Sequence, residues 1–124
     1  AGYAKAACTR GAKVIVVGRN PPQQVLQDAC PGLQFLAADL SSMRAAADVV
    51  KQLKPGSVDT VLFTVGIVNG NEKKTSAEGI ELDTAVSFLS RFVMTTALLK
   101  DGSALRGTPT RKPRVFVMGF PGAP

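Results

Sequence analysis

The side chains with the clearest chemical potential stand directly after short apolar runs of the chain. Arg19 follows the first run, Asp39 the second and Gly66 the third. A guanidinium can pair with phosphate oxygens through a bidentate fork, a carboxylate can accept a hydrogen bond, and glycine lets a ligand approach the backbone closely. Each residue also has a simpler interpretation: an exposed loop arginine, an ordinary strand-to-helix turn and a turn glycine.

Composition narrows the classes of protein that the chain can belong to. At 124 residues with 45% hydrophobic content, it fits one globular domain. No apolar run approaches the ~20 residues of a membrane span, and the first dozen residues do not read as a signal peptide. There is no histidine, and Cys8 and Cys30 show no close pairing, which disfavours a zinc site and a disulfide scaffold. We therefore expect an intracellular, reducing compartment, either the cytoplasm or an organelle matrix.

The net charge of +6 is compatible with an anionic ligand, a nucleic-acid surface or a solvated basic surface. The basic residues are spread along the chain, apart from a group at Arg106, Arg111, Lys112 and Arg114. Direct binding of nucleic acid is not expected, because the six phenylalanines and one tyrosine lie mostly in apolar runs and are not interleaved with a basic cluster.

Four nearly continuous, β-branched runs predict strands buried on both faces, at 13–17, 33–37, 58–65 and 114–118. Helical patterns separate them. A helix over 4–9 is expected to stop at Gly11, a second one opens at Asn20 with two prolines in its first turn, and Ser41 or Ser42 caps a third that Pro55-Gly56 stops. This alternation predicts a parallel sheet with right-handed crossovers.

The longest helix is predicted between Thr75 and Leu99. The segment 75–78 reads as a capping box, with a hydroxyl at the cap and the Glu78 carboxylate three residues on. Asp101-Gly102 marks its end. Its expected apolar stripe, spaced by four, three and four residues, is Leu82, Val86, Leu89 and Val93.

Five segments in this order resemble the short-chain dehydrogenase/reductase family. The segment 11–20 resembles the second strand and its turn, 37–41 the Asp-Leu after the third strand, and 61–67 stands where an Asn-Ala-Gly-Ile motif is usual. The segment 75–99 looks like the long helix of retinol-dehydrogenase-like members, and 114–120 like the strand that ends in the catalytic serine. The resemblance covers essentially the whole chain and implies an α/β, Rossmann-like, doubly wound parallel sheet.

A dinucleotide binds such sheets across the carboxyl ends of the strands, at the topological switch point. We therefore expect NADP, if any dinucleotide binds, because Arg19 stands where an acidic residue would favour NAD. Asp39 could accept a hydrogen bond from the adenine amino group. The expected cofactor-binding residues are Gly18, Arg19, Asn20, Asp39, Leu40, Gly66 and Ile67.

The catalytic set of the family, which is Asn, Ser, Tyr and Lys, departs from this pattern here. Ser87 aligns with the asparagine, and Gly119 or Phe120 falls at the serine position. A Tyr-x-x-x-Lys helix would lie beyond Pro124, and Tyr3 is at the wrong end of the chain. No residue for proton transfer is identifiable, so we expect no catalytic residue in this chain.

We interpret 1–124 as a partial Rossmann-like domain without the first strand, its Gly-rich turn and the C-terminal catalytic half. In the strand order 3-2-1-4-5 this leaves an empty slot inside the sheet, so the 124 residues are not expected to fold stably alone.

Two functions stay open. The chain is either part of an NADP-dependent oxidoreductase, or a non-catalytic, dehydrogenase-like scaffold of a larger assembly. The resemblance also implies a homodimer through the long helix, on which Phe88, Arg91 and Phe92 fall partly off the apolar stripe.

Overall fold

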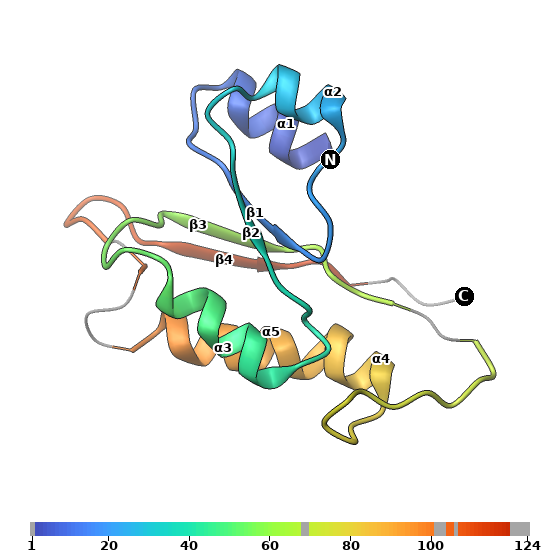
Figure 1. Ribbon diagram of the computed structural model, residues 1–124. Coiled ribbons are helices and arrows are strands. Elements are labelled where there is room, and N and C mark those ends of the chain that lie inside the picture. Colours follow the sequence, from blue (N-terminus) through green and yellow to red (C-terminus); the bar gives the residue numbers. More distant parts are fainter. Residues whose placement is uncertain (1, 68–69, 101–103, 106, 120–124) are drawn as a thin grey trace, which may run out of the picture. The chain divides into compact units, whose positions relative to one another are not determined.

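The computed structural model describes residues 2–67, 70–100, 104–105 and 107–119. The chain divides into two compact units, Ala1–Asp39 (unit 1) and Leu40–Pro124 (unit 2). Helices and strands alternate along it (Figure 1), which confirms the α/β class expected from the sequence. None of the helices among the described residues is long and apolar enough to cross a bilayer.

Unit 1 contains two strands in parallel pairing and two short helices. The elements are α1 (Gly2–Thr9), β1 (Ile15–Gly18), α2 (Gln24–Ala29) and β2 (Gln34–Ala37). Ile15 pairs with Gln34 and Gly18 with Ala37. The chain leaves α1 at Gly11, whose φ of 81° is readily adopted only by glycine. The predicted stop of this helix is therefore confirmed.

The helix α2 starts later than the sequence predicted. Its N-cap is Gln23, in an extended conformation, so Asn20, Pro21 and Pro22 all precede the helix. The physical reason is the double proline, because the ring of a proline disfavours the α conformation of the residue before it. Asn20 and Pro21 both precede a proline, and the first helical turn forms only beyond them.

The two cysteines correct a second expectation. Cys8 and Cys30 form a disulfide, with their Cα atoms 5.7 Å apart. The sequence did not predict this pairing because the two cysteines are 22 residues apart. They come close only because α1 and α2 pack together in the folded unit. Cys30 is also one of the buried side chains of unit 1. The reducing compartment was inferred from unlinked cysteines, and that premise does not hold.

Unit 2 contains a second pair of parallel strands covered by helices. The elements are α3 (Met43–Lys51), β3 (Thr60–Phe63), a long helical segment and β4 (Arg114–Val117). Thr60 pairs with Arg114 and Phe63 with Val117. The third strand was predicted over 58–65, but its regular pairing is confined to four residues, and Val58 forms an isolated bridge with Leu105.

The core of unit 2 lies between α3, the long helical segment and the β3–β4 pair, as Figure 1 shows. Of the two serines predicted as caps, Ser41 and Ser42, Ser42 is the one that caps α3, where it accepts a hydrogen bond from the Ala45 amide at 3.2 Å. The buried apolar side chains are Leu40, Ala46, Val49, Val50, Phe63, Ala85, Val86, Met94, Leu98 and Ala104.

The capping box predicted at 75–78 does not open the long helix. Gly79 has a φ of 78°, which no α-helix contains, and the Ser76 hydroxyl accepts from the amides of Glu78 and Ile80 to form a turn instead. The helix begins after Glu81, whose carboxylate accepts from the amides of Asp83 and Thr84. The predicted N-cap, Thr75, was therefore six residues too early, because the observed N-cap is Glu81. The predicted end at Asp101-Gly102 falls outside the described residues.

The long helical segment changes its winding once. It consists of α4 (Leu82–Thr84), a π-helical turn η1 (Ala85–Leu89) and α5 (Ser90–Leu98). The wider turn advances the buried face by about one residue, because a π-turn holds more residues than an α-turn. The buried line is accordingly Val86, Ser90, Met94 and Leu98, whereas Leu82, Leu89 and Val93 of the predicted stripe are only half-buried.

The sheet order agrees with the expected architecture. In the order 3-2-1-4-5, the second strand neighbours the third, and the fourth neighbours the fifth. Because the first strand of that order is expected to be missing, β1 and β2 correspond to its second and third strands, and β3 and β4 to its fourth and fifth. The observed pairings, β1 with β2 and β3 with β4, match these expected neighbours. In the described part of the chain no strand pairing joins the two pairs. The fold is a partial Rossmann-like one with two pairs of parallel strands.

Candidate functional site

In unit 1 the predicted cofactor residues lie at the carboxyl ends of the two strands. Gly18 ends β1, and its carbonyl accepts a hydrogen bond from the Ala38 amide at 2.9 Å. Arg19 and Asn20 follow in an exposed turn, and Asp39 is exposed two residues beyond the end of β2. The structure therefore brings Gly18, Arg19 and Asp39 to one edge of this strand pair.

In unit 2 the predicted residues fall at the corresponding ends of β3 and β4. Gly66 and Ile67 lie just beyond Phe63, and Gly119 lies two residues beyond Val117. Leu40 differs from the others because its side chain is buried in the core of unit 2, so it can offer a ligand only its backbone. Phe120, the second residue at the serine position, lies outside the described residues.

Ser87 binds the backbone at the end of β3. Its hydroxyl accepts from the Ile67 amide at 3.1 Å, lies 3.3 Å from the Ile67 carbonyl oxygen, and donates to Asp83 at 2.6 Å. Ser87, which the sequence predicts at the asparagine position of the family, is thus a hydrogen-bonding group that contacts the chain just beyond β3. Sequence reasoning did not identify Asp83, although its spacing of four residues from Ser87 on a helix was a usable signal.

Arg91 holds the same region from one turn further along the helix. Its Nε donates to the Val65 carbonyl at 3.1 Å, its Nη2 donates to the same oxygen, and its Nη1 donates to the Met118 carbonyl at 3.0 Å. Val65 follows β3 and Met118 follows β4, so one guanidinium connects the ends of both strands. In the sequence Arg91 stands out only as the charged residue of α5, which does not reveal its backbone partners.

Gly66 is the residue on which these helix groups converge. A Cβ atom at this position would lie 3.4 Å from Nη2 of Arg91 and 3.7 Å from Oγ of Ser87. These are van der Waals contacts, so the space next to the Gly66 backbone is filled by the protein's own polar side chains. A Cβ atom would therefore fit here in contact with both side chains, and the contacts show how closely the helix approaches the chain after β3.

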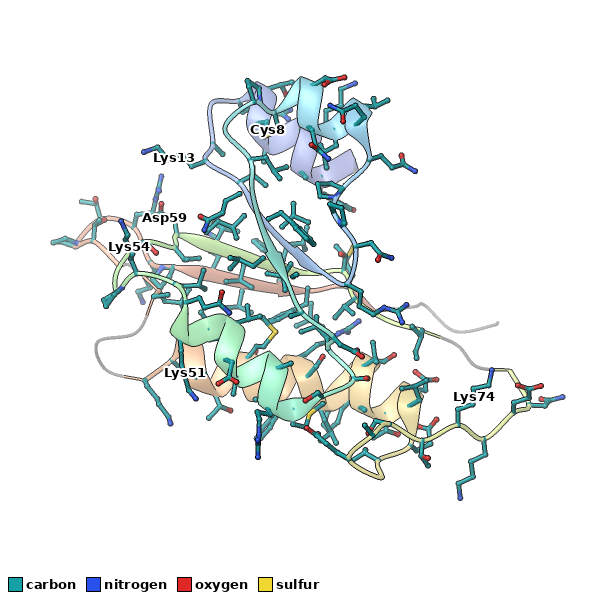
Figure 2. All side chains as sticks on the ribbon, in the orientation of Figure 1. Cys8, Lys13, Lys51, Lys54, Asp59 and Lys74 are labelled. Atoms are coloured by element: carbon teal, nitrogen blue, oxygen red, sulfur yellow. A yellow bond between two sulfur atoms is a disulfide. The ribbon has the colours of Figure 1, made fainter. Side chains whose placement is uncertain are left out.

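The basic residues predicted as a group near Arg111 lie at the amino ends of β3 and β4, opposite to the ends followed by Gly66 and Gly119. Arg111 forms an ion pair with Asp59 at 3.3 Å, and Asp59 directly precedes β3. Figure 2 shows Asp59 and Lys54 at this end of the unit. These cations therefore lie at the opposite end of β3 from Gly66, and they do not supply charge to the strand ends where the cofactor residues of unit 2 are predicted. Arg106 lies outside the described residues.

The two carboxyl groups with perturbed acidity act as helix caps. Hydrogen bonds from the Met43 amide and the Ser42 hydroxyl lower the pKa of Glu78, and bonds from Thr84 and Asp83 lower the pKa of Glu81. Both carboxylates lie at helix N-termini, where negative charge is favoured. Among the described residues no cluster of His, Cys, Asp and Glu could hold a metal ion.

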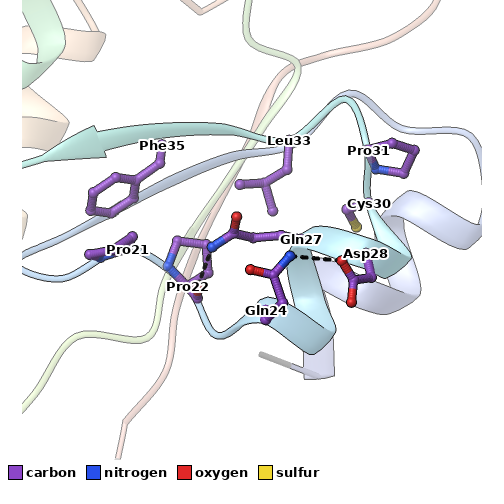
Figure 3. Close-up of a pocket in the computed structure, with 9 residues that line it drawn as sticks. All are labelled: Pro21, Pro22, Gln24, Gln27, Asp28, Cys30, Pro31, Leu33 and Phe35. Carbon is purple, nitrogen blue, oxygen red and sulfur yellow. Dashed lines mark hydrogen bonds between the residues drawn. The ribbon is translucent and has the colours of Figure 1, made fainter.

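Unit 1 also contains a cavity of about 300 Å³ beside α2 and β2, shown in Figure 3. Gln24 donates to Asp28 at 2.8 Å, and Gln27 donates to the Pro22 carbonyl at 2.7 Å. The polar groups of the wall therefore already bond one another. The remaining lining is mostly apolar: Pro21, Cys30, Pro31, Leu33 and Phe35.

Comparisons with known proteins show which proteins this chain is similar to. No family model matches the chain. An uncharacterized oxidoreductase of Saccharomyces cerevisiae is 31% identical over 115 residues, which is 91% of this chain and 36% of that protein. The crystal structure of serine dehydrogenase from Escherichia coli superposes with a TM-score of 0.59 at 25% identity, covering 79% of this chain and 49% of that one. The chain resembles part of a short-chain dehydrogenase/reductase.

A closed form of serine dehydrogenase complexed with NADP+ superposes with a TM-score of 0.60 at 24% identity, covering 79% of this chain and 43% of the other. The chain thus spans about a third of the yeast relative and under half of each solved structure. The resemblance to short-chain dehydrogenases/reductases and the partial Rossmann-like fold are confirmed. The retinol-dehydrogenase-like subgroup stays a prediction.

Proposed function

We propose that this chain is the cofactor-binding part of an NADP-dependent oxidoreductase of short-chain dehydrogenase/reductase type. The observation that carries the proposal is the position of Arg19. It is exposed and directly follows Gly18, the last residue of β1. In a Rossmann-like sheet this turn meets the adenosine ribose, and a guanidinium there can form two parallel hydrogen bonds to a 2′-phosphate. The NADP+ complex of a structural neighbour supports the same choice of cofactor.

The other residues proposed to contact the cofactor present backbone or short polar groups at strand ends. Asp39 can accept from an amino group, and Gly66 offers backbone beyond the end of β3, next to Ile67, whose amide already donates to Ser87. In this proposal the chain binds and orients the dinucleotide and does not transfer protons. Gly119 has no side-chain donor, so the remaining catalytic groups would come from sequence outside these 124 residues.

The test is a fluorescence titration of the full-length protein with NADPH and with NADH. Replacing Arg19 by alanine should weaken NADPH binding by roughly ten- to a hundredfold, because a charge-assisted hydrogen bond contributes about 1.5–3 kcal/mol. NADH binding should stay unchanged, since NADH has no 2′-phosphate. The matched control is Arg10→Ala, which removes an arginine bound to the carbonyl oxygen of Ala6 in the same unit. Equal losses for NADPH and NADH in Arg19→Ala would contradict the proposal.

The second candidate function is a non-catalytic scaffold. The observation in its favour is that the Ser87 hydroxyl is already bonded to Asp83 and to the backbone of Ile67, while Gly119 offers no hydroxyl. If the full-length wild-type protein binds neither dinucleotide, this function replaces the first.

Both functions are compatible with a homodimer through the long helix. Phe88 and Phe92 lie one turn apart on it, and each is 63% exposed. Paired aromatic side chains on an open helix face are typical of protein interfaces. Sedimentation of the Phe88→Ser/Phe92→Ser variant should show monomers where the wild type shows dimers, and an unchanged sedimentation coefficient would contradict the dimer.

A further inference from the structure

The strand ends in unit 2 are joined by one side chain. Regular pairing of β3 with β4 stops at Phe63 and Val117, and the Met118 amide makes one more bond, to the Phe63 carbonyl at 2.9 Å. Beyond this point the Arg91 guanidinium donates to the carbonyls of Val65 and Met118. The two chain segments leaving the sheet are therefore held at a fixed separation by Arg91.

The charge of Arg91 makes this link stronger than an ordinary side-chain bond. The guanidinium is half-buried, and three of its nitrogens donate to carbonyl oxygens. Bonds with a charged donor are roughly twice as strong as neutral ones, and partial burial reduces screening by water. The rigid fork of arginine suits two acceptors on neighbouring segments, whereas the single ammonium of lysine does not.

Arg91 and Ser87 act on both sides of Gly66. Arg91 binds the carbonyl of Val65, the residue before Gly66, and Ser87 binds the amide of Ile67, the residue after it. The two anchoring side chains are spaced four residues apart, so both come from one face of the helix. Because the peptide groups on both sides of Gly66 are held, the backbone there has little freedom to change before a ligand arrives.

We propose that Arg91 is a positioning residue for the cofactor: it holds the ends of β3 and β4 so that Gly66 and Ile67 are already in the conformation that binds the dinucleotide. This inference rests on the proposed function of the chain as a cofactor-binding part. A preorganised site binds more tightly because the ligand does not have to order it. Arg91 acts through the backbone and need not touch the cofactor.

The experiment compares Arg91→Ala and Arg91→Lys with the wild type in the full-length protein. Arg91→Ala should raise the dissociation constant of NADPH and of NADH alike, by about tenfold, because the backbone rather than the 2′-phosphate is affected. Arg91→Lys should recover part of the loss, since an ammonium reaches one carbonyl at a time. Hydrogen exchange at the Ile67 and Met118 amides should speed up in Arg91→Ala while exchange in α3 stays unchanged.

Val49→Ala is the control for general destabilisation. Val49 is buried in α3 and does not take part in the link, so this variant should lower stability without changing dinucleotide affinity. If Val49→Ala loses NADPH affinity as much as Arg91→Ala does, the effect is general and the positioning role is overturned.

The outcomes separate this inference from the function on which it rests. A wild type that binds NADPH, with Arg91→Ala unchanged in affinity, overturns the role of Arg91 and leaves the function standing. A wild type that binds neither NADPH nor NADH overturns both. Loss of affinity for both dinucleotides in Arg91→Ala, set against the NADPH-specific loss in Arg19→Ala, supports both.

Discussion

Among the described residues of unit 1 the buried apolar side chains are Leu26 and Cys30, whereas those of unit 2 extend from Leu40 through α3, β3 and the long helical segment to Ala104. In unit 1 a disulfide links α1 to Cys30 at the end of α2. In unit 2 the helices α3 and α5 pack on each other. A segment as short as unit 1 buries little apolar surface, and a covalent link then compensates for the missing core.

The polar contacts of the two units differ in the same direction. In unit 1 the side-chain bonds are local, such as Gln24 to Asp28 and Thr9 to Ala6. Unit 2 has local side-chain bonds as well, but several others join residues far apart in the sequence, as when Ser42 donates to Glu78 or Arg91 donates to Val65 and Met118. Long-range polar bonds hold loops against helices, which is why the more rigid strand ends are expected in unit 2.

The largest effect is expected in the core of unit 2. Leu98→Ala should lower the free energy of unfolding by about 4 kcal/mol, because it leaves a cavity at one of the most deeply buried side chains. Leu99→Ala is a matched control, since Leu99 is 67% exposed and should change stability by less than ~0.5 kcal/mol. Urea denaturation of the full-length protein measures both values. Equal effects for the two leucines would mean that α5 does not pack as described.

A somewhat smaller effect is expected from opening the disulfide of unit 1. Cys8→Ala should destabilise unit 1 by about 3 kcal/mol, the loop-entropy value for a separation of 22 residues. Hydrogen exchange should quicken in α1 and α2 and stay unchanged in α3 and α5. If Cys8 and Cys30 of the wild-type protein titrate as free thiols without reductant, the disulfide is contradicted. The reducing compartment would then again be the expectation.

The smallest effect is expected at Glu78, and it depends on pH. The pKa of this carboxyl is held below its ordinary value of 4.5 by the Met43 amide and the Ser42 hydroxyl. Its stabilisation is therefore fully present above pH 4.5 and is lost as the pH falls through the lowered pKa.

Glu78→Gln should accordingly lower the Tm slightly at pH 7, and the difference from the wild type should shrink progressively as the pH is lowered below 4.5. The control is Glu72→Gln, which removes an exposed ion pair with Lys74 and should have little effect across the same pH range. A Glu78→Gln difference that showed no decrease at any pH below 4.5 would show that the carboxylate charge is not responsible.

The regular elements were predictable because their signals are local. Apolar runs located the four strands of the described residues to within a few residues, and the cap of α3 was narrowed to Ser41 or Ser42, of which Ser42 is the one observed. Ser87 was also placed on the correct helix. The resemblance identified Gly18, Arg19, Asp39 and Gly66 as strand-end residues, and the structure places them there.

What could not be predicted depends on contacts across the chain. The pairing of Cys8 with Cys30 requires α1 and α2 to pack together, and the redirection of Glu78 to the N-terminus of α3 requires a turn at Gly79. Arg91 was seen only as a residue beside the apolar stripe, because its partners are backbone carbonyls, which leave no trace in side-chain patterns.

The π-turn at Ala85–Leu89 has a consequence for how this chain is aligned with others. Such a turn accommodates one residue more than a regular α-helix of the same length. A relative whose helix is regular throughout would need a one-residue gap within this turn for the positions beyond it to correspond. Without the gap, Arg91 would be aligned with a residue of the relative that is one position away from its true counterpart. A search for proteins that share the arginine should therefore compare both registers.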